Sequence, residues 1–207
     1  MIWEIPETDT YFAPLLKPEG WEIDHLEEAL KFCKSFRTAI DGGAHIGTWA
    51  VRMARHFDQV LAFEPNYPTL QCLLKNTHNH APTVAVMGGA LGDVSGYCMV
   101  VEDTTRKGNT GAYMIDIKPG GTVPVMTVDQ FLLDDLDLLK LDVEGSEILA
   151  LKGAQQTIGR CKPVIVAECK EFTPPRNGGV AATKDWLNGI GYREVGGIRN
   201  DRIFVPK

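Results

Sequence analysis

A glycine-rich segment, Asp41-Gly42-Gly43-Ala44-His45-Ile46-Gly47, separates two stretches of the chain with different hydrophobic patterns. Residues 36–40 before it end an apolar and β-branched run, and residues 48–56 after it carry apolar side chains at helical spacing. Glycine tolerates positive φ and close approach to a ligand, and the start of a helix presents unpaired N–H groups. The segment predicts a strand, a tight turn and a helix around a nucleoside-cofactor loop, with a purely structural turn as the alternative.

The spacing of the glycines separates two classes of cofactor. Dinucleotide-binding loops follow the pattern G-x-G-x-x-G, whereas this loop reads D-x-G-x-x-x-G from Asp41 through Gly43 to Gly47. The loop resembles motif I of the class I S-adenosylmethionine-dependent methyltransferases. An NAD-dependent oxidoreductase is a distant alternative, because no Tyr-x-x-x-Lys motif or His–Asp pairing stands out in the sequence.

The second predicted strand, residues 60–63, ends at Glu64, about twenty residues beyond the loop. An acidic side chain at this strand end can accept hydrogen bonds from both hydroxyls of a ribose. Glu64 is therefore the candidate ribose ligand, and an ordinary surface glutamate is the alternative.

Length and charge limit the remaining possibilities. The chain has 207 residues and no linker rich in Pro, Gly or Ser, which indicates one domain over residues 1–207. Within it we expect an N-terminal helical extension over residues 1–35 and a catalytic core over residues 36–207. The formal net charge of −6 and the lack of a long basic run disfavour nucleic acid as a partner.

The cysteines and the N-terminus bear on the compartment. The five cysteines show no CxxC spacing and are predicted to be free thiols in a reducing compartment; they are Cys33, Cys72, Cys98, Cys161 and Cys169. The N-terminal residues lack a secretory pattern, and no apolar run is long enough to span a membrane. We therefore expect a cytoplasmic protein without a membrane partner, of undetermined oligomeric state.

Predicted strands and helices alternate along the chain, which is typical of a doubly wound α/β sheet. A leading amphipathic helix is predicted over residues 23–36, and further helices over residues 68–79, 148–151 and 181–190. Later strands are predicted at residues 83–87, 138–142 and 163–168, with residues 123–131 leading towards the second of these. Residues 192–195 and 202–205 are predicted to form a closing hairpin.

An acidic segment, Lys140-Leu141-Asp142-Val143-Glu144-Gly145-Ser146-Glu147, follows the fourth predicted strand, beside the expected cofactor crevice. If the segment is extended, Asp142 and Glu144 point to the same side, because strand side chains alternate. Ser146 is then a candidate N-cap for the next helix, with Gly153 as its end. A cluster of acids engaged only in salt bridges or capping is the alternative.

Four segments together resemble the FkbM-like methyltransferase family: DGGAHIG at residues 41–47, FEP at 63–65, ALGD at 90–93 and KLDVEGSE at 140–147. The resemblance implies a doubly wound, mostly parallel seven-stranded sheet with a C-terminal antiparallel hairpin, S-adenosylmethionine as cofactor and a hydroxyl oxygen as acceptor. His45 stands where the family commonly has asparagine, and we interpret it as bracing the loop. Asn109 and Thr110 lie in a segment that resembles one bordering the acceptor pocket.

The chemistry of the implied cofactor assigns roles to the candidates. Its amino-acid end is expected at Asp41 and the loop amides near Gly43 and Gly47, its ribose at Glu64, and its adenine between Ala90 and Leu91. The full set of expected cofactor ligands is Asp41, Gly43, His45, Gly47, Thr48, Glu64, Pro65, Ala90, Leu91 and Asp142.

Methyl transfer requires alignment and the removal of a proton from the acceptor. Asp142 is the first candidate for a base or an acceptor-orienting group, followed by Glu144 and by Glu168, which ends the fifth strand. Asp142 and Glu168 could imitate the divalent-metal site of catechol-type O-methyltransferases. Hard cations need several oxygen ligands, however, and Cys169 is a poor one, so we expect no metal.

The sequence does not identify the acceptor. We expect a small hydroxylated molecule, such as a sugar, a glycan end or a polyketide-like compound. Segments near residues 1–22, 102–122 and 171–180 are expected to select it, because substrate choice resides in loops. The alternative function is a catalytically silent nucleoside-binding module with a methyltransferase fold.

Overall fold

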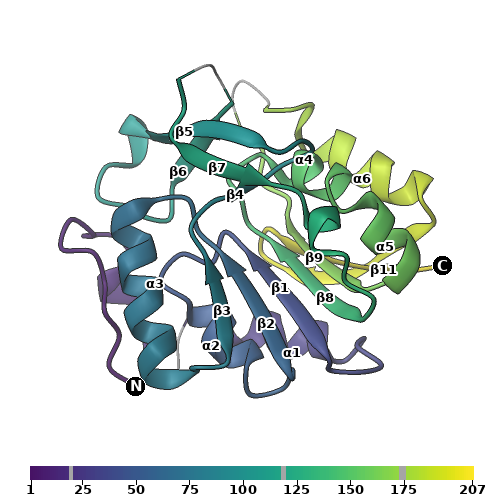
Figure 1. The fold of residues 1–207 in the computed structure, drawn as a ribbon, viewed down its shortest axis with the longest axis horizontal. Coiled ribbons are helices and arrows are strands. Elements are labelled where there is room, and N and C mark those ends of the chain that lie inside the picture. The colour runs from purple at the N-terminus through teal and green to yellow at the C-terminus, as the bar shows by residue number, and fades with distance from the viewer. Residues whose placement is uncertain (19–20, 118–119, 173–175) are drawn as a thin grey trace.

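Strands that alternate with helices along the chain form one large sheet, and the helices cover both of its faces (Figure 1). The computed structural model describes residues 1–18, 21–117, 120–172 and 176–207. The strand order is β10-β11-β9-β8-β1-β2-β3. These strands are β1 Thr38–Gly42, β2 Gln59–Phe63, β3 Val84–Met87, β8 Leu136–Leu141, β9 Val164–Glu168, β10 Tyr192–Ile198 and β11 Asp201–Pro206. Strands β1, β2, β3, β8 and β9 pair in parallel, and β11 pairs antiparallel with β9 and β10. The predicted seven-stranded doubly wound sheet with its closing hairpin is confirmed.

The order of the strands creates a crevice at one edge of the sheet. From β1 the chain adds β2 and β3 on one side, and later adds β8 and β9 on the other. Where the winding reverses, the loops after neighbouring strands diverge to opposite faces and leave room for a ligand. The carboxyl ends of β1 and β8 therefore flank the natural binding position.

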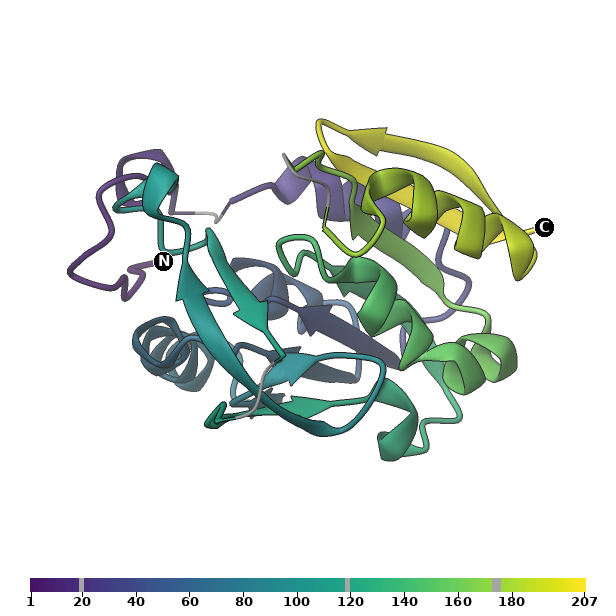
Figure 2. The same ribbon diagram turned by 90° about the horizontal axis from the view of Figure 1, so that it is seen from above.

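Two hydrophobic clusters hold the layers together. Strand side chains alternate, so that Ala39 packs in one cluster and Ile40 in the other. Helices α1 Ile23–Leu30, α2 Thr48–Met53 and α3 Tyr67–His80 cover the first face, and α4 Glu147–Lys152, α5 Gln155–Cys161 and α6 Gly179–Gly189 cover the second (Figure 2). Full burial of a leucine such as Leu139 contributes about 1.5–3 kcal/mol, so this packing fixes the strands beneath the crevice.

The leading helix is shorter than predicted. It ends at Leu30 rather than near residue 36, and a three-residue 3-10 turn, η1 Ala13–Leu15, precedes it. The chain leaves the helix so that Ser35 and Arg37 can bind Asp137 at the start of β8, with Arg37 Nη2 2.7 Å from Asp137 Oδ1. A charged and directional contact thus overrides helical periodicity, and residues 1–35 are mostly not helical.

The start of α4 departs from the capping prediction. Ser146 occupies the N-cap position, but its side chain makes no capping hydrogen bond. Glu147 Oε1 instead accepts hydrogen bonds from the backbone N–H groups of Val143 at 3.1 Å and Gly145 at 3.2 Å. Gly153 does end the helix, as predicted, and α5 follows as a helix that the sequence pattern did not indicate.

A second, smaller sheet lies beyond the carboxyl edge of the main sheet (Figures 1 and 2). It has the order β4-β7-β5-β6, with β4 Ala90–Leu91, β5 Gly96–Glu102, β6 Tyr113–Asp116 and β7 Val123–Met126. Two short turns accompany it, η2 Thr104–Arg106 and η3 Val128–Phe131. This sheet, which was not predicted from the sequence, forms a roof over part of the crevice. Residues 19–20, 118–119 and 173–175, which belong to the segments expected to select the acceptor, lie outside the described residues.

Two further observations concern the length of the helices and the state of the cysteines. Among the described residues, no helix combines the length and apolar character needed to cross a membrane. All five cysteines are free thiols, as predicted.

Candidate active site

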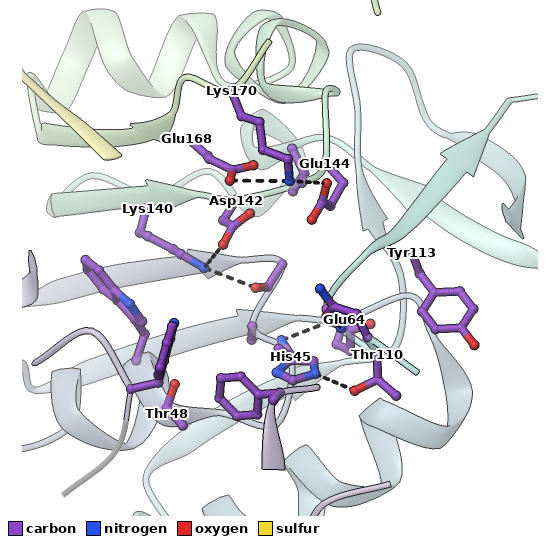
Figure 3. A pocket seen from close by; sticks show the side chains of 18 of the residues that line it. His45, Thr48, Glu64, Thr110, Tyr113, Lys140, Asp142, Glu144, Glu168 and Lys170 are labelled. Carbon is purple, nitrogen blue, oxygen red and sulfur yellow. Dashed lines mark hydrogen bonds and ion pairs between the residues drawn. The ribbon is translucent and has the colours of Figure 1, made fainter. Parts of the chain in front are cut away.

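A cavity of about 830 Å³ opens at the carboxyl edge of the main sheet. Its volume lies in the upper part of the range for small-molecule sites, which gives room for two reactants. We call its two parts the glycine-loop half, which residues 43–45, 48–49, 63–65 and 89–91 line, and the acidic half, which Asp142, Glu144, Glu168 and the chain around them line. Figure 3 shows the two groups of side chains on opposite sides of Lys140.

The glycine loop is shaped by backbone geometry. Gly43 has φ +75° and Gly47 has φ +94°, values that favour glycine. The N–H groups of Gly43 and Ala44 both donate to the carbonyl of Phe63, at 3.0 and 2.9 Å, which ties the loop to the end of β2. The sequence thereby places the start of α2 against the cavity.

Glu64 is buried at the end of β2 and lines the cavity. Its Oε2 accepts the backbone N–H of His45 at 2.9 Å, and its Oε1 accepts that of Asn66 at 2.8 Å. Each carboxylate oxygen keeps a further lone pair that a ligand hydroxyl can use. Burial raises the pKa of Glu64 to about 7, against the effect of these two hydrogen bonds.

His45 connects the glycine loop to the roof. The hydroxyl of Thr110 donates to Asp9 at 2.6 Å, so its oxygen accepts a hydrogen bond from His45 Nε2 at 2.8 Å. Burial lowers the pKa of His45 to about 4, so its ring is neutral at pH 7. With a φ of +53° and a ring held by Thr110 and Phe12, His45 has the geometry of a brace.

Lys140 lies between the two halves. Its side chain is almost fully buried, and its Nζ lies 3.1 Å from Asp41 Oδ1, 3.1 Å from the Gly43 carbonyl and 3.9 Å from Asp142 Oδ2. Burial alone would lower the pKa of Lys140, but the charges of Asp41 and Asp142 outweigh this and raise it. The ammonium therefore stays charged and links the loop to the acidic half.

Three carboxylates meet in the acidic half. Asp142, Glu144 and Glu168 each bring an oxygen to within 4.8 Å of the others. Burial and then the charge of Glu168 raise the pKa of Asp142, and burial and the charge of Glu144 raise that of Glu168 to about 7. Asp142 and Glu144 come together through a turn, with Glu144 at φ +49°, and not through the extended segment that we predicted, because β8 ends at Leu141.

Cations of the chain already balance this acidic cluster. Arg106 reaches Glu144 with Nη1 and Nη2, at 3.2 and 2.9 Å, and Lys170 Nζ lies 2.8 Å from Glu144 Oε2 and 3.6 Å from Glu168 Oε1. With Lys140 beside Asp142, three cations face three carboxylates. The cluster has the oxygen donors for a divalent metal, but Glu144 spends both of its oxygens on Arg106 and Lys170.

Most of the residues that the sequence analysis singled out lie on the cavity. Those in the glycine-loop half are Gly43, His45, Thr48, Glu64, Pro65, Ala90 and Leu91. Those in the acidic half are Asp142, Glu144 and Glu168, and Asn109 and Thr110 line the roof. Asp41 and Gly47 do not line it: Asp41 is fully buried beneath Lys140, and the N–H of Gly47 donates to Ala44 within the loop.

Several lining residues were not predicted. Arg106, Lys140 and Lys170 supply the cations, and His25 and Asp201 form a hydrogen-bonded pair at the far end of the acidic half. Lys140 lies two residues before Asp142 in a buried strand, and a lysine in such a position could have been predicted to pair with the acids of the site. His25 and Asp201 are 176 residues apart, and no local pattern connects them.

The fold and the cavity together define the class of protein. A doubly wound sheet with a glycine loop after its first strand, an acid after its second and a closing antiparallel hairpin is the Rossmann-like methyltransferase fold. A family model described as the methyltransferase FkbM domain matches residues 41–194. The chain belongs to this family, and membership supports an enzyme that transfers methyl groups. No curated protein matches the sequence significantly.

Solved structures share the fold at low sequence identity. A methyltransferase FkbM from Methylobacillus flagellatus is 20% identical with a TM-score of 0.56, and the match covers 99% of this chain and 48% of that one. The chain thus spans about half the length of that relative. A precorrin-8w decarboxylase from Methanobacterium thermoautotrophicum is 14% identical, with a TM-score of 0.55 and full coverage of both chains. A precorrin-6y C5,15-methyltransferase from Geobacter metallireducens is 12% identical, with a TM-score of 0.54 and coverage of 91% and 90%.

Proposed function

We propose that this chain transfers a methyl group from S-adenosylmethionine to a hydroxyl oxygen of a small or glycan-like acceptor. One observation carries the proposal: a single cavity joins a glycine loop and the Glu64 carboxylate to a cluster of three carboxylates. The first set suits a nucleoside with an amino-acid tail, and the second suits a hydroxyl group that must be held in line with the methyl group.

The residues of the glycine-loop half fit the cofactor. Glu64 retains lone pairs for the two ribose hydroxyls, and Pro65, Ala90 and Leu91 offer an apolar surface to adenine. The indole Nε1 of Trp49 is buried on the cavity wall and has no hydrogen-bond partner among the described residues. Its N–H group can therefore donate a hydrogen bond to a bound ligand. When bound, the cofactor would supply an electrophilic methyl group on a positively charged sulfur.

The amino-acid end of the cofactor is assigned to Gly43, His45 and Thr48, which border the start of α2. Asp41 and Gly47 do not line the cavity, and we propose that they support cofactor binding indirectly. Asp41 does so through Lys140, whose charge suits a carboxylate, and Gly47 through the shape of the loop. Asp142 lies beyond the loop, where its carboxyl group would approach the sulfonium.

The acidic half is assigned to the acceptor. Asp142 is proposed to orient the acceptor hydroxyl in line with the methyl group, with Glu168 as its neighbour and Glu144 holding Arg106 and Lys170 in place. Alignment of two reactants accounts for much of the rate in such reactions. Asn109 and Thr110 line the roof of the same cavity, with Thr110 held to His45 of the glycine-loop half, and we assign them to contacts with a sugar, a glycan end or a polyketide-like molecule. Free thiols at all five cysteines fit a reducing compartment such as the cytoplasm.

Calorimetry tests the cofactor part of the proposal. S-adenosylmethionine and S-adenosylhomocysteine should bind with micromolar affinity, and NAD should not bind; binding of NAD alone would refute the proposal. Radiolabelled methyl donor with a panel of hydroxylated acceptors tests turnover. Binding of the cofactor with no transfer to any acceptor would favour the catalytically silent module.

A further inference from the structure

A buried histidine and aspartate form a pair at the far end of the acidic half. His25, in the first turn of α1, has its Nδ1 2.5 Å from Oδ2 of Asp201 at the start of β11. Both residues are at least nine-tenths buried, and both line the cavity. Because a carboxylate only accepts hydrogen bonds, Nδ1 carries the hydrogen in the neutral imidazole, and Nε2 then has the basic lone pair. No described residue forms a hydrogen bond with Nε2.

Three carboxylates around His25 favour its charged form. Glu22 Oε2 lies 4.0 Å from Nδ1, and Asp24 on α1 and Asp201 on β11 add further negative charge. Lys140 on β8 faces the same region and interacts with Glu22 and Asp201. Burial alone would lower the pKa of His25, but the hydrogen bond to Asp201 and the charge of Glu22 raise it.

The backbone at this end is held in an unusual conformation. Glu22 precedes α1 with φ +55° and ψ +41°, a left-handed conformation that costs a non-glycine residue energy. Its carboxylate nevertheless points towards His25. Such strain is retained where the surrounding structure requires it, and it is frequent at active sites.

The sheet places this pair beside the acidic cluster. Asp201 lies directly opposite Glu168 in the antiparallel register of β11 and β9, so their side chains leave the sheet on the same side. Asp142 lies close to Glu168 in turn. Glu64 is at the other end, beyond β8 and β1 in the strand order. A cofactor whose ribose binds Glu64 therefore leaves the space in front of His25 to the second reactant.

The acidic cluster is poorly suited to take the proton of the acceptor. Burial and the repulsion between their charges raise the pKa of both Asp142 and Glu168, so protons remain on this pair at a higher pH than on free carboxyl groups, and a protonated carboxyl group accepts no further proton. Lys140 and Lys170 oppose a further loss of negative charge there. The pair of Asp142 and Glu168 can orient the acceptor hydroxyl group. A different group must therefore accept the hydroxyl proton.

We propose that His25, held by Asp201, is the general base of the reaction, an inference that rests on the proposed function. The acceptor hydroxyl oxygen forms the new C–O bond to the methyl carbon while the C–S bond breaks and its electron pair goes to sulfur. The hydroxyl proton goes to His25 Nε2. The resulting imidazolium is stabilised by Asp201 and then loses its proton to solvent before the next turnover.

Nuclear magnetic resonance of the labelled full chain tests the position of His25 without an acceptor. The imidazole of His25 is titrated in protein dialysed against EDTA, with S-adenosylmethionine bound and with S-adenosylhomocysteine bound. These ligands differ by one methyl group and one positive charge. A base close to the reacting methyl group feels that charge, so its pKa should be lower by at least about 0.3 units in the S-adenosylmethionine complex.

The other outcomes are distinct. The exposed His56, at the opposite edge of the sheet, is the internal control, and its signals should be the same in both complexes. Equal titration of His25 in both complexes, or an imidazole that does not titrate, would overturn the inference. If neither S-adenosylmethionine nor S-adenosylhomocysteine binds, the proposed function is wrong, and the inference about His25 is rejected with it.

Two variants then test the catalytic role. His25→Asn should lower kcat about 10²–10⁴-fold and leave the affinity for S-adenosylhomocysteine within twofold. Asp201→Asn should move the rising limb of the pH–rate profile to lower pH, because the carboxylate no longer supports the imidazolium. Full activity of His25→Asn, or a weakened cofactor affinity with unchanged kcat, would show that the pair serves another role. A purely structural role of Asp201 would leave the pH limb in place.

Discussion

The two halves of the cavity are built in different ways. In the glycine-loop half, the ligand-facing groups come from short segments that end β1 and β2, and backbone N–H groups join them, as when His45 donates to Glu64. In the acidic half, charged side chains from distant segments pair with one another. Glu144 meets Arg106 from the roof and Lys170 from the end of β9, and His25 meets Asp201.

This difference in construction suits two different tasks, the binding of a shared cofactor and the recognition of a variable acceptor. Under the proposed function, the backbone-built loop binds the cofactor that other family members would share, and its geometry survives changes in most side chains. A cluster of mutually compensating charges can be altered one pair at a time, which suits the recognition of different acceptors. Lys140 is the exception, because it contacts the Gly43 carbonyl on one side and Asp142 on the other.

The largest effect is expected in the acidic half. Asp142→Asn keeps the size of the side chain but removes the carboxyl group that orients the acceptor hydroxyl, so methyl transfer should fall by about 10²–10⁴-fold. Affinity for S-adenosylhomocysteine should change by less than tenfold, about 1.4 kcal/mol. Radiolabel transfer and calorimetry measure the two quantities. Full activity in this variant would remove Asp142 from the mechanism.

Lys140→Met should damage both halves together. It leaves the fully buried Asp41 without its cation, and breaking a buried ion pair in this way costs about 3–5 kcal/mol. Denaturant unfolding measures this loss in the free energy of unfolding. The double variant with Asp41→Asn should recover part of the stability, and a Lys140→Met protein as stable as the wild type would contradict the linking role.

Glu64→Ala should affect only the glycine-loop half. Loss of the hydrogen bonds to the ribose should weaken S-adenosylhomocysteine binding by roughly 10- to 100-fold, or about 1.5–3 kcal/mol. Calorimetry measures the change, and the melting temperature serves as the control for folding. Unchanged affinity would refute the ribose assignment.

The smallest effect concerns pH. Burial raises the pKa of Glu64 to about 7, so this carboxyl is mainly protonated at pH 6 and mainly ionised at pH 8. The ionised form is the stronger acceptor, so affinity for S-adenosylhomocysteine should rise about fivefold over this interval. Glu64→Gln should abolish this dependence, and a persistent rise in that variant would assign it to another group.

The glycine-loop half could be predicted because its signals are local. The loop itself, the acid at the end of β2 and the alternation of strands and helices each lie within a few residues of one another. The acids of the other half were also visible, because Asp142, Glu144 and Glu168 follow the ends of β8 and β9.

The rest depended on contacts between distant residues. The second sheet escaped prediction because β5 has few buried residues, with Tyr97 and Met99 exposed, so it lacks a clear apolar face. The early end of α1 depends on Asp137, about a hundred residues away by sequence. The pairing of His25 with Asp201 appears only when β11 folds back against β9.

Gly43 limits how such a protein can diverge. A Cβ at this position would lie only 1.8 Å from the Asp142 carbonyl oxygen, so no other residue fits without moving the loop and the end of β8 apart. The sequence of the roof can therefore change during evolution while position 43 remains glycine. A library of variants selected for new acceptors should therefore randomise the roof and leave position 43 untouched.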